Sequence, residues 1–108
     1  MQNVQSITII DDLVGKLGKY YKPELIIVFG SIARGDFTEE SDLDLLIVKN
    51  TKKSPIWRRV EVRRILSTEI PLDVIVYTQN EFNKLKESGS DFIKEILSKG
   101  KIVYEKTY

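Results

Sequence analysis

Residues 25–48 read Leu25-Ile-Ile-Val-Phe-Gly30-Ser31-Ile-Ala-Arg34-Gly35-Asp-Phe-Thr-Glu-Glu-Ser41-Asp42-Leu-Asp44-Leu-Leu-Ile-Val48, two apolar runs joined by a polar segment. Both runs are short, apolar and rich in Leu, Ile and Val, which predicts buried strands over residues 25–30 and 43–48. Side chains alternate along a strand, so Asp42 and Asp44 are expected to point to one face. The apolar residues between and beyond them then point to the other face, into a core.

The two acids suggest a cation site. Neighbouring carboxylates at the end of a buried strand repel each other, so either one is protonated or a cation lies between them. A divalent ion with oxygen ligands, most simply Mg²⁺, is the expected occupant. Gly30 lets backbone approach a ligand closely, and a helical turn beginning at Ser31 would direct free N–H groups at a phosphate. Together these features indicate phosphoryl or nucleotidyl transfer.

Simpler interpretations exist for each feature taken alone. Gly30-Ser31 is also typical of an ordinary strand-to-helix turn, and Ser41-Asp42 of a turn before a strand. Asp44 fits neither, because an acid within an apolar strand is costly without a partner. We therefore favour a functional role for the whole set.

Length and composition limit the chemistry further. The 108 residues predict one domain, residues 1–108, and a net charge of +1 gives no sign of nucleic-acid or membrane binding. The absence of Cys and His excludes thiol catalysis, histidine acid–base chemistry and metal sites built from those ligands. No run has the length of a membrane span or the pattern of a signal peptide, so we expect a cytoplasmic protein.

The expected fold class is α/β, a small mixed β-sheet with helices packed mainly on one face. The first two strands are expected to carry the site at one edge of the sheet. Apolar spacing, Pro and Gly positions and the Thr78-Gln-Asn-Glu81 capping box predict the other elements. In chain order these are a helix over 6–21, a helix over 55–67, a strand over 71–77, a helix over 79–98 broken near 88–90, and a strand over 101–105.

The helix over 55–67 is strongly basic and has more than one interpretation. Its arginines are Arg58, Arg59, Arg63 and Arg64. They form a solvated face, a docking surface for an acidic partner, or a phosphate or RNA site. The residues expected to share one side of this helix are Ile56, Val60, Arg63 and Leu66. Trp57 is either a core residue or an interface anchor.

The spacing also carries a family resemblance. Gly30-Ser31, ten residues and then Asp42-Leu43-Asp44 resemble the signature of the DNA polymerase beta-type nucleotidyltransferase superfamily. The fuller strings Gly30-Ser31-x-Ala33-Arg34-Gly35 and Ser41-Asp42-Leu43-Asp44-Leu45 are similar to those of the minimal nucleotidyltransferases (MNT). These are small antitoxins encoded beside a HEPN-domain toxin. The resemblance covers nearly the whole chain, from about residue 5 to about residue 105.

The resemblance implies the nucleotidyltransferase fold and transfer of AMP from ATP to a hydroxyl. It implies two Mg²⁺ ions held by Asp42, Asp44 and Asp73, with Asp73 also drawing the proton from the attacking hydroxyl. Gly30 and Ser31 would hold the β- and γ-phosphates. Arg34 either contacts the triphosphate or is a solvated helix residue.

The implied acceptor is a tyrosine of a partner HEPN toxin, and its adenylylation would make this chain an antitoxin. The alternative is an antitoxin with weak or no transferase activity that neutralises its partner by binding alone. A decayed enzyme should have lost one of Asp42, Asp44 and Asp73, and all three are present. A transferase acting on an antibiotic or other small molecule fits less well, because the resemblance would then require a second domain.

Overall fold

The computed structural model describes residues 4–35 and 42–107. Its elements are α1 (Val4–Lys16), a π-helical turn η1 (Leu17–Tyr21), β1 (Leu25–Phe29), α2 (Gly30–Arg34), β2 (Leu43–Val48), α3 (Pro55–Leu66), β3 (Leu72–Tyr77), α4 (Gln79–Glu87), α5 (Asp91–Lys99) and β4 (Lys101–Glu105). Every strand and helix expected from the sequence is present. None of the described helices is long and apolar enough to cross a membrane.

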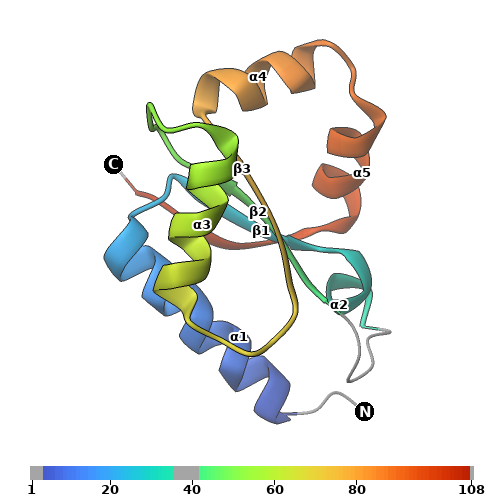
Figure 1. Cartoon of the computed structure of the whole chain (residues 1–108). Helices are drawn as coiled ribbons and strands as arrows, with labels where there is room; N and C mark the ends of the chain where they lie inside the picture. Colours follow the sequence, from blue (N-terminus) through green and yellow to red (C-terminus); the bar gives the residue numbers. More distant parts are fainter. Residues whose placement is uncertain (1–3, 36–41, 108) are drawn as a thin grey trace.

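The four strands form one mixed sheet in the order β3-β2-β1-β4. β1 is antiparallel to β2 and β4, whereas β2 and β3 are parallel and are joined by the crossover helix α3 (Figure 1). The strands β1 and β2 are therefore the inner strands. The expected position of the site at a sheet edge is corrected accordingly: its residues lie where β1 ends and β2 and β3 begin.

Helices lie on both faces of the sheet (Figure 1). The larger core lies under α1, η1 and α3 and includes Leu13, Leu17, Ile26, Val28, Leu45, Ile47, Val62, Leu66, Val74 and Val76. The smaller core lies under α4 and α5 and comprises Ile27, Leu46, Val48, Phe82, Ile93 and Ile96. The mixed α/β fold expected from the sequence is confirmed, with the larger part of the core on one face.

The sequence predicted one helix over residues 6–21, but the last part of this segment is not α-helical. Its last turn is π-helical, and Lys22 ends it with a φ of 54° and an N–H that donates to Leu17 O at 2.9 Å. The wider turn buries both Leu17 and Tyr21. Gly18 lies against the ring of Tyr104, since a Cβ at Gly18 would be 2.8 Å from a ring carbon. Packing against β4 therefore requires glycine at this position.

The buried side of α3 also differs from the prediction. Arg58, Val62 and Leu66 are the buried residues of this helix, whereas Ile56 is 64% exposed and Trp57 56% exposed. Trp57 is therefore not a core residue. The prediction failed because an arginine occupies a core position, which a pattern of apolar residues does not reveal.

The guanidinium group of Arg58 is buried because three acceptors surround it. Its Nε donates to Lys53 O at 2.7 Å, and its Nη1 donates to Val76 O at 3.2 Å and to Glu81 Oε1 at 2.7 Å. A charge can occupy the interior when it is paired and hydrogen-bonded in this way. Arg58 thus ties α3 to β3 and to the start of α4.

Candidate functional site

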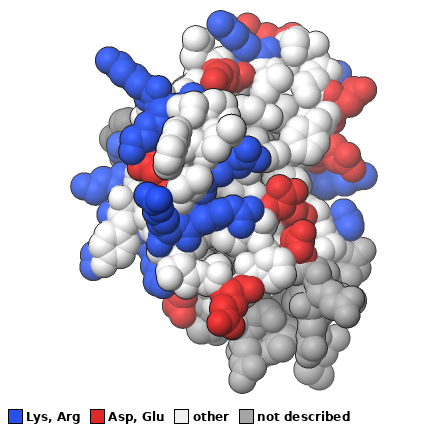
Figure 2. All heavy atoms as spheres, viewed as in Figure 1, with Lys and Arg blue, Asp and Glu red and all other residues white. Residues whose placement is uncertain are grey.

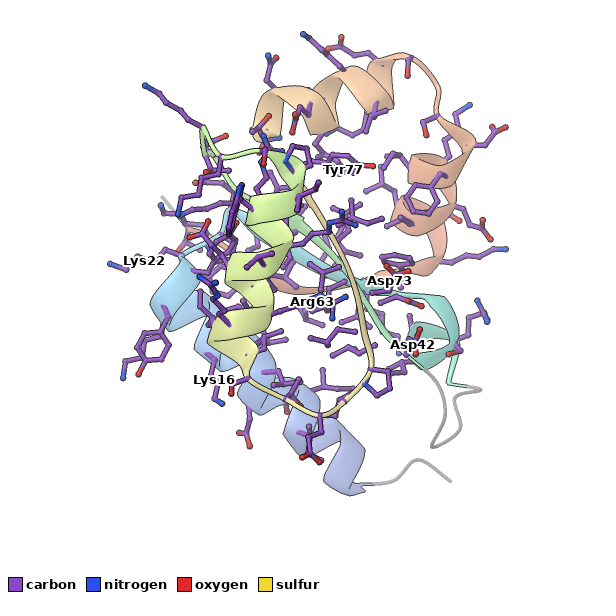
Figure 3. The ribbon with its side chains drawn as sticks, in the orientation of Figure 1. Lys16, Lys22, Asp42, Arg63, Asp73 and Tyr77 are labelled. Carbon is purple, nitrogen blue, oxygen red and sulfur yellow. The ribbon has the colours of Figure 1, made fainter. Side chains whose placement is uncertain are left out.

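Three aspartates lie at the end of the sheet where β2 and β3 begin. Asp44 is the second residue of β2 and Asp73 the second residue of β3, and the two are direct register partners. Asp42 lies one residue before β2 and is exposed. Asp42 and Asp73 lie near each other in Figure 3. Since side chains alternate along a strand, all three aspartates belong to the same face of the sheet.

The charges of this cluster act on the Asp44 carboxyl. Burial raises the pKa of Asp44 above its ordinary value of 3.8, and the negative charges of Asp73 and Asp42 raise it further. The positive charge of Arg34 opposes this shift. Asp73, Asp42 and Arg34 therefore all lie within electrostatic reach of the Asp44 carboxyl.

Gly30 lies directly against the Asp44 carboxylate. The antiparallel pairing of β1 and β2 places Phe29 opposite Asp44, so the junction of β1 and α2 is beside the acid. A Cβ built on Gly30 would overlap Asp44 Oδ2, and Gly30 has a φ of 76°. Glycine is needed here for its backbone conformation and for space. The turn at Gly30 therefore presents backbone without a side chain next to the Asp44 carboxylate.

The other residues expected at the phosphate site follow Gly30 in α2. Ser31 is half-buried and Arg34 is exposed. A cavity of about 140 Å³ opens between this turn and α5, with Gly30 and Arg34 on one side and Glu95 and Lys99 on the other. Gly30 and Arg34 thus line the same cavity, and Ser31 lies between them in α2.

Helix α5 also contributes to this region, which the sequence did not predict. The rings of Phe29 and Phe92 meet edge to face, with centroids 5.9 Å apart and planes at 89°. Lys99 and Glu95 are an exposed pair on the same helix, with Nζ and Oε1 3.4 Å apart. Nothing in the sequence links α5 to the Gly30 turn, because the two are distant in the chain. The alternation of side chains along β1 could have placed Phe29 on the same face of the sheet as Asp44, but it could not have identified Phe92 as its neighbour.

The donor set suits a hard divalent cation. The negative charge that Asp42, Asp44 and Asp73 concentrate here would be neutralised by Mg²⁺, which prefers oxygen ligands. Within residues 4–35 and 42–107, no three acidic side chains are already gathered closely enough to hold a metal ion. Asp44 and Asp73 are register partners, and Asp42 lies one residue before β2.

The surface beside the acids is basic. On the face shown in Figure 2, Lys and Arg side chains gather over α3. Of the four arginines on this helix, Arg58 is buried and the other three are exposed. Arg63 reaches β3, where its Nη2 donates to Leu72 O at 2.7 Å, next to Asp73.

Comparison with known sequences gives consistent matches. The family described as "Polymerase beta, Nucleotidyltransferase" matches residues 12–108. A Methanocaldococcus jannaschii protein, MJ0604, whose name places it among the protein adenylyltransferases, is 33% identical over 97 residues. That match covers 88% of this chain and 94% of the relative.

Solved structures resemble the fold. A Sulfolobus solfataricus protein named as a nucleotidyltransferase superposes with a TM-score of 0.65 and 21% identity, covering 95% of this chain and 83% of that one. A crystal structure described as a toxin–antitoxin with AMP-PNP gives a TM-score of 0.65 and 20% identity, covering 90% and 74% of the two chains. At such identities the likeness concerns the fold alone.

Proposed function

The chain belongs to the polymerase beta nucleotidyltransferase family, and on that premise we propose that it transfers AMP from Mg-ATP to a hydroxyl of a partner protein. The observation that carries the proposal is the adjacency of Asp44 and Asp73 beside the bare backbone of Gly30. Carboxylates next to an open glycine turn are the combination that metal-assisted phosphate chemistry needs.

Each residue of the cluster has a proposed role. Asp42, Asp44 and Asp73 would hold Mg²⁺, and Gly30 and Ser31 would hold the β- and γ-phosphates. The bound Mg²⁺ would neutralise the triphosphate and the departing pyrophosphate. Arg34 lies close enough to Asp44 to oppose its pKa shift, and its positive charge suits a triphosphate contact.

The proposed role of Asp73 is to receive the acceptor hydroxyl. Asp73 is exposed, and β3 is one of the two outer strands of the described sheet, so a hydroxyl from another protein can approach from this side. The hydroxyl oxygen bonds to the α-phosphorus as the bond from the α-phosphorus to the bridging oxygen breaks. Pyrophosphate leaves with that oxygen, and the hydroxyl proton passes to Asp73. The product is an AMP ester of the acceptor.

The proposed acceptor is a tyrosine of a HEPN-type toxin, whose adenylylation would make this chain an antitoxin acting in the cytoplasm. Two findings support this more specific part. The sequence resembles the MNT antitoxins, and a solved toxin–antitoxin shares the fold. The competing candidate is neutralisation by binding alone, which the retained Asp42, Asp44 and Asp73 disfavour.

A transfer assay tests the proposal. The protein is mixed with α-labelled ATP, Mg²⁺ and the HEPN-type protein encoded beside it. The labelled partner should appear with the unchanged protein and with the control Asp11→Asn/Asp12→Asn, which alters two exposed acids of α1. It should be lost in Asp42→Asn/Asp44→Asn. A stable complex that silences the partner equally well in this variant, with no label in any sample, would establish the binding-only antitoxin instead.

A further inference from the structure

Among the strands in the described part of the chain, none pairs with the outer edge of β3. Leu43 N donates to Pro71 O and Lys49 N donates to Tyr77 O. The backbone N–H and C=O groups of the odd-numbered residues from 71 to 77 therefore point towards β2. The peptide groups of Leu72, Val74 and Val76 therefore point outward. In Figure 1, α3 lies alongside β3 and α4 begins just past its C-terminal end.

Two arginines of α3 occupy part of this edge. Arg63 donates to Leu72 O at 2.7 Å, and Arg58 donates to Val76 O at 3.2 Å. Capping by charged side chains is a common protection against pairing with a foreign strand. A partner segment at this edge therefore cannot form a full ladder and must be held chiefly by its side chains.

A cavity of about 570 Å³ lies beside the same edge, and we name it the β3 groove. Ile75 and Tyr77 of β3, Arg59 of α3, and Lys84 and Leu85 of α4 are among its lining residues. Its volume is within the range of ligand-binding clefts, and its lining combines apolar side chains with a few polar groups. The groove can take the side chains of a short extended peptide.

The charge of the groove is positive. Arg58 and Glu81 neutralise each other within it, with Nη1 and Oε1 2.7 Å apart. The remaining charged lining residues are Arg59 and Lys84, both exposed and both positive. Further basic side chains gather over α3 on this flank (Figure 2). The complementary ligand is therefore acidic, with an apolar side chain for the region around Ile75 and Leu85.

The groove leads towards the acid cluster. Tyr77, Ile75 and Asp73 occupy alternate positions of β3 and so belong to one face, at intervals of roughly 7 Å. Figure 3 shows Tyr77 and Asp73 successively along this strand, with Asp42 beyond them. A peptide that extends from the groove along β3 reaches Asp73 within about three or four of its own residues.

We propose that the β3 groove binds an extended acidic segment of the acceptor protein and guides the tyrosine of that segment to Asp73. This inference rests on the proposed adenylyl transfer, because Asp73 is the residue given the acceptor proton. It adds the chemistry of the acceptor segment: an apolar anchor, flanking acids and a tyrosine roughly three residues away.

The first test measures binding without ATP, so it does not depend on transfer. The probe is a fluorescein-labelled peptide of about ten residues that carries glutamates, one leucine and one tyrosine at the proposed spacing. Its affinity for the full chain is measured by fluorescence anisotropy. Arg59→Glu/Lys84→Glu should weaken binding about tenfold or more, because it reverses both groove charges. The same peptide with lysines in place of the glutamates should not bind.

Matched controls separate the groove from general charge. Arg64→Glu/Lys86→Glu makes the same charge change on the same two helices, at exposed positions that do not line the groove. It should alter affinity by less than about twofold. Equal weakening in both double variants, or no binding of the acidic peptide to the unchanged protein, would overturn the proposal.

The second test blocks the groove during transfer. The chain has no cysteine, so Lys84→Cys and Lys86→Cys can each be labelled at a single position with a bulky maleimide. Labelled Lys84→Cys should transfer AMP to the neighbouring HEPN-type protein at least about tenfold more slowly, with Mg-ATP binding unchanged, whereas labelled Lys86→Cys should not be slowed. Equal rates would overturn the groove assignment. Absence of transfer by the unchanged protein would reject the proposed function. The peptide-binding comparison of the two double variants would still test whether the groove binds an acidic segment.

Discussion

The backbone of Gly30 and the carboxylate of Asp44 are in such close contact that a Cβ on Gly30 would overlap Asp44 Oδ2. The contact exists because the antiparallel register of β1 and β2 sets Phe29, the residue before Gly30, opposite Asp44. The proposed phosphate turn and the proposed metal ligand are therefore parts of one packed unit. A substitution at Gly30 should therefore displace the Asp44 carboxylate.

Gly30→Ala should damage both stability and transfer. The substitution forces a side chain into a left-handed backbone conformation, which costs about 1–2 kcal/mol, and displaces the Asp44 carboxylate. Displacement of a catalytic group by about 1 Å can lower a rate about 100-fold, and we expect a loss of that order in AMP transfer. Urea unfolding and the transfer assay measure the two effects.

Gly89→Ala is the matched control for this prediction. Gly89 has a φ of 75°, nearly that of Gly30, but a Cβ there would meet only the end of the Lys94 side chain at 3.7 Å. It should show the conformational cost without loss of transfer. Equal activity in the two variants would mean that the contact between Gly30 and Asp44 has no role in the reaction.

Magnesium should stabilise the protein through the acid cluster. Burial and two neighbouring carboxylates raise the pKa of Asp44, so the ionised cluster is strained at neutral pH, and a bound cation relieves that repulsion. Added Mg²⁺ should raise the melting temperature at pH 7, and EDTA should reverse the gain. Asp44→Asn should reduce the gain, whereas Asp12→Asn on α1 should keep it. An equal response in both variants would place the bound Mg²⁺ elsewhere.

The sequence was most informative where short-range rules apply. Alternation along a strand predicted that Asp42 and Asp44 share a face, and the spacing resemblance added Asp73, which the parallel register of β2 and β3 puts beside Asp44. The capping box of α4 is also local, and it is present: Thr78 Oγ1 accepts from Glu81 N at 3.2 Å and Glu81 Oε1 accepts from Thr78 N at 2.7 Å.

Features that depend on distant segments were not predictable in this way. The burial of Arg58 requires acceptors on three other segments, and the π-helical turn before Lys22 accompanies the packing of Gly18 on Tyr104. The β3 groove likewise exists only because α3 and α4 flank the same strand. No periodicity within one element encodes such arrangements.

Glu81 should give the protein an acid-sensitive contribution to stability. The backbone hydrogen bond from Thr78 is the main cause that lowers the pKa of Glu81 below 4.5, and Arg58 lowers it further. A lowered carboxyl pKa means that the unfolded chain binds the proton more tightly, so this contribution is complete above about pH 4.5 and is lost as the pH falls through the lower folded-state pKa.

Glu81→Gln should therefore destabilise the protein at pH 7, by less than about 1 kcal/mol because the group is partly exposed, and the difference should shrink below about pH 4.5. Thermal unfolding across this pH range measures it. Glu95→Gln, which alters an exposed pair on α5, should show no such trend. A difference that stays constant with pH would contradict the assigned role of the Glu81 charge.

Tyr21→Phe should stabilise the protein. Within the part of the chain that the structure describes, the Tyr21 hydroxyl is buried without a hydrogen-bond partner, and burial is the main cause that raises the pKa of Tyr21 to about 12. A buried hydroxyl without a partner costs free energy, so its removal should raise the free energy of unfolding by about 1 kcal/mol.

Tyr20→Phe, at a side chain that is 64% exposed, should change the free energy of unfolding by less than about 0.5 kcal/mol. Urea unfolding compares the two, and a phenolate titration should lose its step near pH 12 only in Tyr21→Phe. A loss of stability in Tyr21→Phe would show that the hydroxyl has a partner in solution.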